Sequence, residues 1–136
     1  MRDVHSVTVR SYNMSKIHGK NTIPEVTLRR ELHSRGFRFR LHGSKLPGRP
    51  DVVFAGRKKV IFVNGCFWHM HDCRYGLVTP KTNAEFWQAK RSATVVRDAR
   101  KTAELQALGW KVLTVWECQL RKDGDGIERA VAFLQN

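Results

Sequence analysis

Apolar and polar positions alternate along the chain in ways that predict ordered structure from about residue 22 onward. The segment "TIPEVTLRRELHSRG" at 22–36 is typical of a helix. Thr22 and Glu25 have the spacing of a capping box, and Gly36 marks the end. The next segment, "FRFRLH" at 37–42, alternates apolar and basic residues. This alternation predicts a strand with an apolar face and a cationic face, whose arginines meet either solvent or phosphate.

Three short apolar runs predict strands in the centre of a covered sheet. They are "DVVFA" at 51–55, "VIFV" at 60–63 and "WKVLTVW" at 110–116. A long helix is expected from about Asn83 to Leu108, and Thr82 with Glu85 is a second possible capping box. A short amphipathic helix, "DGIERAVAFLQN", closes the chain. This order of elements predicts an α/β domain with three layers, a mixed sheet flanked by helices.

The composition divides the chain into two parts. Residues 1–21 hold few apolar positions and mix Ser, Asn, Lys and His, so we expect an arm that orders on a partner. Residues 22–136 are expected to form a single domain, which is long enough to bury a core.

The charge balance indicates the class of partner. Lys and Arg number 25 against 12 Asp and Glu, which gives a formal net charge of +13. Such a field favours a polyanion, so nucleic acid is the expected partner and a membrane surface is second. Neither an apolar run that could span a membrane nor the apolar centre of a secretory signal is found, and we expect a cytoplasmic protein.

The decamer "NGCFWHMHDC" at 64–73 is rich in metal-ligand side chains. The candidate zinc ligands are Cys66, His71, Cys73 and Cys118. If the strands at 60–63 and 110–116 are neighbours, these four side chains can form a closed tetrahedral site of the structural kind, which uses every cysteine in the chain. His69 and Asp72 remain competing ligands at this point.

Asp51 is a candidate ligand for a second metal. It opens an apolar strand, and position alone favours a carboxylate that caps a turn or pairs with Arg49. Glu25, Asn64 and His69 are expected nearby, however, on a basic protein. Two acids suffice to hold Mg²⁺ against a phosphate, because this ion keeps most of its waters. His69 can exchange a proton with water or a leaving oxygen near neutral pH.

Several aromatic and apolar side chains are suited to entering a DNA stack. The candidates are Phe67, Trp68, Trp87 and Met14. Large rings on a loop stiffened by a metal can wedge between base pairs, at a cost of about a few kcal/mol for each unstacked step. The alternative for any of these rings is packing over the core or the metal site, which is what we expect of Trp110 and Trp116.

Five motifs in this order resemble the very short patch repair (Vsr) endonucleases of bacteria. They are "LPGRPDVVF", "VIFVNGCFWHMHDC", "EFWQAKR", "VVRDARK" and "LGWKVLTVWEC", and the likeness runs from "RSYNMSKI" to Cys118. The resemblance implies a fold similar to type II restriction endonucleases with a structural zinc. It also implies Mg²⁺-dependent nicking of one strand 5′ of the thymine in T:G mismatches left by 5-methylcytosine deamination, which starts repair.

The resemblance also implies roles for individual residues. Asp51 matches a magnesium-binding aspartate, and the backbone carbonyl of Val63 matches a second ligand position. His69 matches a histidine assigned to proton transfer, while Glu25 and Asp98 match acids near the metal, Glu25 as one that holds a metal-bound water. The implied zinc ligands are Cys66, His71, Cys73 and Cys118, which selects His71 over His69. The implied intercalating residues are Phe67, Trp68 and Trp87, with Met14 from the opposite groove.

One departure from the family pattern and the expected partners, oligomeric state and location complete the prediction. Asn64 stands where some relatives carry a histidine, so it can hydrogen-bond a phosphate or water but cannot change protonation near neutral pH. His69 then acts alone or with His5 or His18 from the arm. The expected partner is mismatched double-stranded DNA, with mismatch-repair proteins possible, a monomeric state, and a location on the bacterial nucleoid. The rival functions are a restriction-type endonuclease and a non-cutting, zinc-stabilised module that binds distorted DNA.

Overall fold

The computed structural model of the chain describes residues 22–73, 76, 82–121 and 124–136. Met14, His5 and His18 belong to the arm at 1–21, so the expectations for the arm lie outside the described residues.

Four strands form one mixed sheet in the order β1-β2-β3-β4. They are β1 (Arg40–Leu41), β2 (Val52–Phe54), β3 (Lys59–Asn64) and β4 (Lys111–Trp116). The pairs β1–β2 and β2–β3 are antiparallel, whereas β3 and β4 run parallel with Asn64 opposite Trp116. The strands predicted at 51–55, 60–63 and 110–116 are therefore confirmed, as is the contact between the last two. This parallel pair brings the segments that follow Asn64 and Trp116 to the same edge of the sheet.

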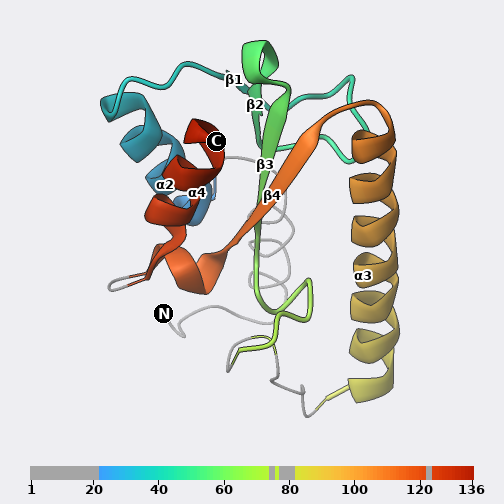
Figure 1. The fold of residues 1–136 in the computed structure, drawn as a ribbon. Helices are drawn as coiled ribbons and strands as arrows, with labels where there is room; N and C mark the ends of the chain where they lie inside the picture. The colour runs from blue at the N-terminus through green and yellow to red at the C-terminus, as the bar shows by residue number, and fades with distance from the viewer. Residues whose placement is uncertain (1–21, 74–75, 77–81, 122–123) are drawn as a thin grey trace.

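In the described part of the chain, three α-helices cover the two faces of the sheet (Figure 1). On one side lie α2 (Ile23–Ser34) and α4 (Gly126–Gln135), and on the other side lies α3 (Ala84–Ala107). The expected three-layer α/β arrangement is confirmed. Among the described residues, no helix combines the length and the apolar character that crossing a bilayer requires.

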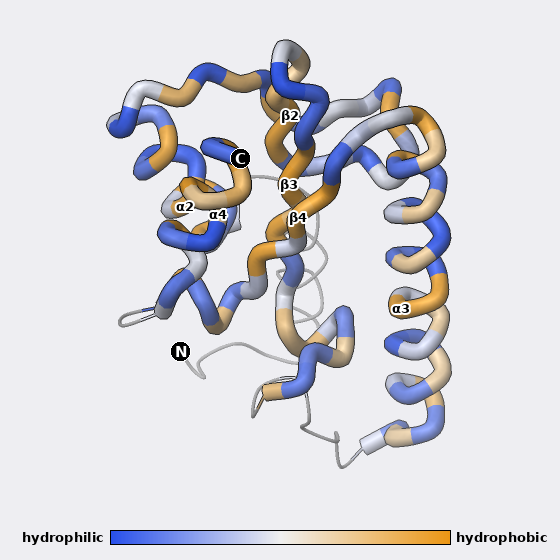
Figure 2. The backbone as a smooth tube through the Cα atoms, viewed as in Figure 1, coloured by the Kyte–Doolittle hydropathy of each residue, from blue (hydrophilic) through white to orange (hydrophobic). Residues whose placement is uncertain are grey.

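Alternate side chains of the strands supply the two halves of the core. One cluster joins α2 and α4 to the sheet through Leu28, Leu32, Val52, Phe54, Ile61, Val115, Ala130 and Leu134. A smaller cluster on the other face joins α3 to the sheet through Val53, Val60 and Leu105. Figure 2 shows these apolar strands between helices that carry many polar positions. Because both faces are covered, the strands read as continuous apolar runs in the sequence.

The strand predicted at 37–42 is shorter than expected. Only Arg40 and Leu41 pair with β2, because β2 ends at Phe54 and the φ of 52° at His42 interrupts the extended backbone. The predicted alternation holds in part: Phe37 and Phe39 pack against the core and Arg38 and Arg40 are exposed, but Leu41 is exposed as well.

The two predicted capping boxes have different outcomes. At α2 the Thr22 hydroxyl accepts a hydrogen bond from the Glu25 N–H at 3.3 Å, so the capping role of Thr22 is confirmed. At α3 the Thr82–Glu85 pair was a wrong prediction. This helix begins after Asn83, whose φ of 55° lies in the left-handed region, and no side chain caps it. Asn is one of the few residues that tolerate the left-handed conformation, so the chain enters the helix through Asn83 and the capping box does not form.

Candidate active site and metal centre

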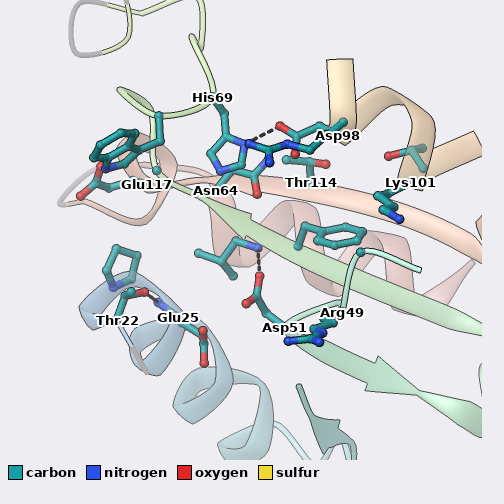
Figure 3. A pocket seen from close by; sticks show the side chains of 18 of the residues that line it. Thr22, Glu25, Arg49, Asp51, Asn64, His69, Asp98, Lys101, Thr114 and Glu117 are labelled. Atoms are coloured by element: carbon teal, nitrogen blue, oxygen red, sulfur yellow. Dashed lines mark hydrogen bonds and ion pairs between the residues drawn. The ribbon is translucent and has the colours of Figure 1, made fainter. Parts of the chain in front are cut away.

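A cavity of about 570 Å³ lies where β2 begins and β3 ends (Figure 3). It is lined by six residues that the sequence singled out for chemistry: Glu25, Asp51, Val63, Asn64, His69 and Asp98. They come from α2, the start of β2, the end of β3, the loop after β3, and α3. Segments far apart in the sequence thus converge on one hollow, which is the concave setting expected of an active site.

Asp51 is held by the neighbouring strand. Its Oδ2 accepts a hydrogen bond from the backbone N–H of Val63 at 2.7 Å. The N–H and C=O groups of one strand residue face the same neighbouring strand, so the Val63 carbonyl also faces the side of Asp51. Arg49 lines the same cavity, but no ion pair between Arg49 and Asp51 is found in the described part of the chain. The alternative reading of Asp51 as a partner of Arg49 therefore finds no support.

The two acids of the cavity are close enough to affect one another. Burial raises the pKa of Asp51 to about 7, the Glu25 carboxylate adds to this rise, and the Val63 N–H opposes it. Glu25 is only 2% exposed. Two carboxylates confined in one buried site repel each other when both are ionised, and a bound cation relieves that repulsion. The pair has the chemistry of a site for a hard cation such as Mg²⁺.

His69 is oriented by Asp98 on α3. Its Nδ1 is hydrogen-bonded to the Asp98 Oδ2, which leaves Nε2 as the nitrogen that can exchange a proton with a ligand (Figure 3). Asn64 lies beside them at the end of β3 and is 8% exposed. Within the described part of the chain its amide makes no hydrogen bond to another side chain, so it is available to a ligand in the cavity.

A second cluster lies at the end of the β3–β4 pair. The ligand atoms of Cys66, His71, Cys73 and Cys118 all lie within 4.8 Å of one another. Burial raises the pKa of the Cys66 thiol to about 12, so a cation is needed to hold it as a thiolate. Burial lowers the pKa of His71 and so favours the neutral imidazole that binds metals. Three sulfurs and one imidazole suit a soft tetrahedral ion and fit zinc.

Neighbouring residues decide which histidine joins this cluster. Trp116 stacks on the His71 ring, with centroids 4.1 Å apart and planes 11° from parallel. His69 is instead engaged by Asp98, and Asp72 is exposed. Neither His69 nor Asp72 belongs to the cluster. Trp110 and Trp116 pack on the core and the metal cluster, as expected of them.

An aromatic cluster lies beside the cavity. Phe67, Trp68 and Trp87 contact one another edge to face, with centroids 5.3 to 5.9 Å apart. Phe67 and Trp68 line the cavity, whereas Trp87 reaches it only through its contact with these rings. Phe86 extends the cluster outward and is 58% exposed.

Sequence reasoning missed the residue that anchors this cluster. Arg91 is 3% exposed, and its Nε donates to the Phe67 carbonyl at 2.7 Å while its Nη2 donates to the Gly76 carbonyl. Its guanidinium carbon also lies 4.3 Å from the centroid of the Phe67 ring. The signals in the sequence were its place at the end of the motif "EFWQAKR" and its position one helical turn after Trp87. The other polar lining residues that were missed are Arg49, Arg97, Lys101, Thr102, Thr114 and Glu117.

Comparison with known proteins decides the family. The family described as DNA mismatch endonuclease Vsr matches residues 2–75. The chain belongs to the Vsr family. Vsr-family membership confirms the resemblance found in the sequence motifs.

The relatives point to the same chemistry. The chain is 50% identical over 120 residues to the type II nicking enzyme V.XorIIP of Xanthomonas oryzae pv. oryzae, which covers 88% of each chain. It is 47% identical over 121 residues to the DNA mismatch endonuclease Vsr of Escherichia coli, which covers 89% of this chain and 77% of the relative. It is 42% identical over 121 residues to the type II nicking enzyme V.NmeAIP of Neisseria meningitidis, with 89% and 86% covered. This Vsr-family protein is a DNA-nicking hydrolase.

Proposed function

We propose that this Vsr-family enzyme uses Mg²⁺ to nick one DNA strand 5′ of the thymine in a T:G mismatch and so starts very short patch repair of deaminated 5-methylcytosine. The observation that carries the proposal is that Phe67, Trp68 and His69 line the same cavity as Asp51. Groups suited to opening the base stack and groups suited to phosphodiester hydrolysis therefore act within one site.

Asp51 and the Val63 carbonyl are the residues that would hold Mg²⁺, with Glu25 beside them. When bound, the ion offsets the negative charge that develops on the phosphate and favours an attacking hydroxide. Asp51 contributes by keeping its carboxylate directed along the end of β3, where the Val63 N–H holds it. Oxygen donors of this kind suit a hard cation that retains several waters.

His69 is the residue that moves a proton in the proposed reaction. With Nδ1 bound to Asp98, the ring presents Nε2 to water or to the leaving oxygen. Asp98 is a positioning residue, because it acts on the reaction through its hydrogen bond to the His69 imidazole. Asn64 donates its amide N–H to a phosphate oxygen and thereby positions the scissile group without exchanging a proton.

The aromatic cluster recognises the mismatch by entering the stack. A T:G pair is easier to unstack than a matched pair, so rings that wedge beside it select for it. Phe67, Trp68 and Trp87 supply these rings. Arg91 holds Phe67 through a hydrogen bond to its carbonyl and through the contact of its guanidinium with the ring. Met14 from the arm is proposed to enter from the opposite groove, but it lies outside the described residues.

Zinc bound by Cys66, His71, Cys73 and Cys118 is proposed to hold the loop after β3 against the end of β4. That loop carries Phe67, Trp68 and His69, so the zinc site would set the wedge and the proton donor at a constant distance from Asp51. The mixed sheet with helices on both faces supports an architecture of the type II restriction endonuclease kind. We further propose that the enzyme acts as a monomer and that mismatch-repair proteins are its partners.

A nicking assay on an array of 5′-labelled duplexes tests this function. The array contains T:G, other single mismatches and matched pairs in varied flanking sequences, each with Mg²⁺ or with EDTA. We expect one nick, in the thymine strand of T:G duplexes, only with Mg²⁺, and no cleavage by Asp51→Ala. Cutting of both strands of matched DNA would instead identify a restriction-type endonuclease, and tight T:G binding without any nick would identify a binding module.

A further inference from the structure

A second histidine–carboxylate pair adjoins the cavity, which Glu25 lines and His42 does not. The His42 Nε2 is 2.8 Å from the Glu25 Oε2, and Glu25 is almost completely buried. His42 follows β1 directly and is 17 positions from Glu25 in the sequence. Nothing in the sequence motifs pointed to His42, because this contact forms only when the turn after β1 packs against α2.

His42 also contacts the other acid of the site. Its backbone N–H donates to the carbonyl oxygen of Asp51 at 3.0 Å, and the neighbouring Gly43 N–H donates to Pro50 at 2.9 Å. One residue is thus bonded to the side chain of Glu25 and to the backbone of Asp51. Its φ of 52° lies in the left-handed region, which a bulky residue adopts only where the surrounding structure holds it there.

We propose that His42 is a positioning residue that holds the Glu25 carboxylate toward Asp51 for magnesium binding. Glu25 makes an ion pair with Arg29 as well, at 3.1 Å and on the same Oε2 atom. Both contacts are made by Oε2, so His42 and Arg29 together restrict the rotation of the carboxylate. Because Glu25 and Asp51 repel each other when ionised, a carboxylate without these contacts would turn away from Asp51. The inference rests on the proposed magnesium-dependent function.

The contact with Asp51 allows the two roles of His42 to be separated. The turn uses the backbone N–H of residue 42, which every substitution except proline retains. Among the described residues, the hydrogen bond to Glu25 is the contact that uses the His42 side chain. His42→Gln keeps an N–H donor of similar reach, whereas His42→Ala removes it, and both variants must adopt the same backbone conformation. A comparison of the two therefore isolates the hydrogen bond to Glu25 from backbone strain.

The test measures magnesium binding directly and then catalysis. Isothermal titration calorimetry with Mg²⁺ on the DNA-free protein is followed by nicking kinetics on a T:G duplex over a range of Mg²⁺ concentrations. We expect His42→Ala to weaken Mg²⁺ binding and raise the half-saturating Mg²⁺ concentration about 10-fold, as for other residues that orient metal ligands. The KM for DNA should stay within about twofold, since His42 does not line the cavity. His42→Gln should recover most of the loss.

The control is His33→Ala. His33 is an exposed histidine on α2 that packs edge to face on Phe39, and among the described residues it makes no ion pair. It should leave Mg²⁺ binding unchanged. Unaltered Mg²⁺ binding in His42→Ala overturns the inference, and so does an equal loss in His42→Gln, which would indicate backbone strain alone. A wild-type enzyme that nicks without Mg²⁺ dependence overturns the proposed function together with this inference.

Discussion

His69 and Asp98 are hydrogen-bonded through Nδ1 and Oδ2, although one lies in the loop after β3 and the other on α3, 29 positions later in the chain. This bond joins the loop after β3 to α3, and both residues line the cavity (Figure 3). It leaves Nε2 of His69 as the nitrogen that can exchange a proton with a ligand, so the proposed role of His69 depends on its contact with α3.

Asp98→Asn should slow nicking by reducing the contribution of His69. General acid–base catalysis is worth about 10²- to 10⁴-fold, so the loss in kcat should fall within that limit. The loss should also be non-additive with His69→Ala, because one residue acts through the other. Single-turnover nicking of the two single variants and the double variant measures this coupling. Glu31→Gln, which removes a carboxylate from an exposed ion pair, is the control and should be neutral. Full additivity would contradict the assigned role of Asp98.

Asp51→Asn should abolish nicking and stabilise the metal-free protein at pH 8. The pKa of Asp51 is raised to about 7 in the folded protein, so its ionised form disfavours folding above that pH. This cost disappears as the pH falls through 7 toward the ordinary range of a carboxyl group. The gain in the free energy of unfolding should be on the order of 1 to 4 kcal/mol at pH 8 and close to zero at pH 4.

Denaturant unfolding in EDTA at the two pH values measures this effect. Binding of T:G duplex in EDTA should remain near that of the wild type, since the amide can still accept the Val63 N–H. A variant that is less stable than the wild type at pH 8 would contradict the burial argument.

Cys118→Ser should release zinc and destabilise the protein by several kcal/mol. Closed zinc sites contribute apparent binding free energies of about 10 to 16 kcal/mol in small zinc domains, and much of this supports folding. Metal analysis should return about one zinc for each wild-type chain and less for the variant. Asp72→Ala alters a neighbouring acid outside the cluster and should retain the metal. Zinc loss in Asp72→Ala with retention in Cys118→Ser would reverse the assignment.

Trp68→Ala should weaken binding to T:G duplexes about 10- to 100-fold, the range for loss of one stacked aromatic contact. Binding to matched duplexes should change little, because the phosphate contacts that dominate it are untouched. Leu108→Ala is the control. Leu108 is a large apolar residue that is 56% exposed, and it lies at the C-terminal end of α3, whereas the aromatic cluster lies at the N-terminal end. Fluorescence anisotropy at constant salt measures both. An equal loss on matched and mismatched DNA would argue that Trp68 supports the fold and does not read the mismatch.

Asn64→Ala should lower kcat while leaving Mg²⁺ binding intact. Asn64 is buried, lines the cavity and directs an amide toward it, so its loss leaves the scissile phosphate less well held. Nicking kinetics together with Mg²⁺ calorimetry distinguish this effect from metal loss. Wild-type nicking by Asn64→Ala would remove this residue from the site.

The sequence predicted elements well where local patterns decide them. The start of α2 followed from Thr22, and the β3 and β4 strands followed from their apolar runs, because capping and burial leave a local signature. The failures have local causes too. The capping box of Thr82 and Glu85 does not form because Asn83 adopts a left-handed conformation at the start of α3. The strand expected at 37–42 is limited to two residues because its partner β2 is short and the backbone is no longer extended at His42.

Composition, motif order and periodicity by themselves determined the basic character, the three-layer fold class and the resemblance to the Vsr family, because these features follow from neighbouring residues or from their order. They also predicted the Cys and His side chains that the structure brings together in one cluster. Only the tertiary structure decided that Asp98 engages His69, that Arg91 anchors Phe67, and that His42 holds Glu25. Each of these contacts joins separate elements, and its formation depends on how α2, α3 and the loops pack around the β3–β4 pair. Contacts between side chains of different layers leave no periodic pattern in a single sequence, so only the three-dimensional structure identifies them.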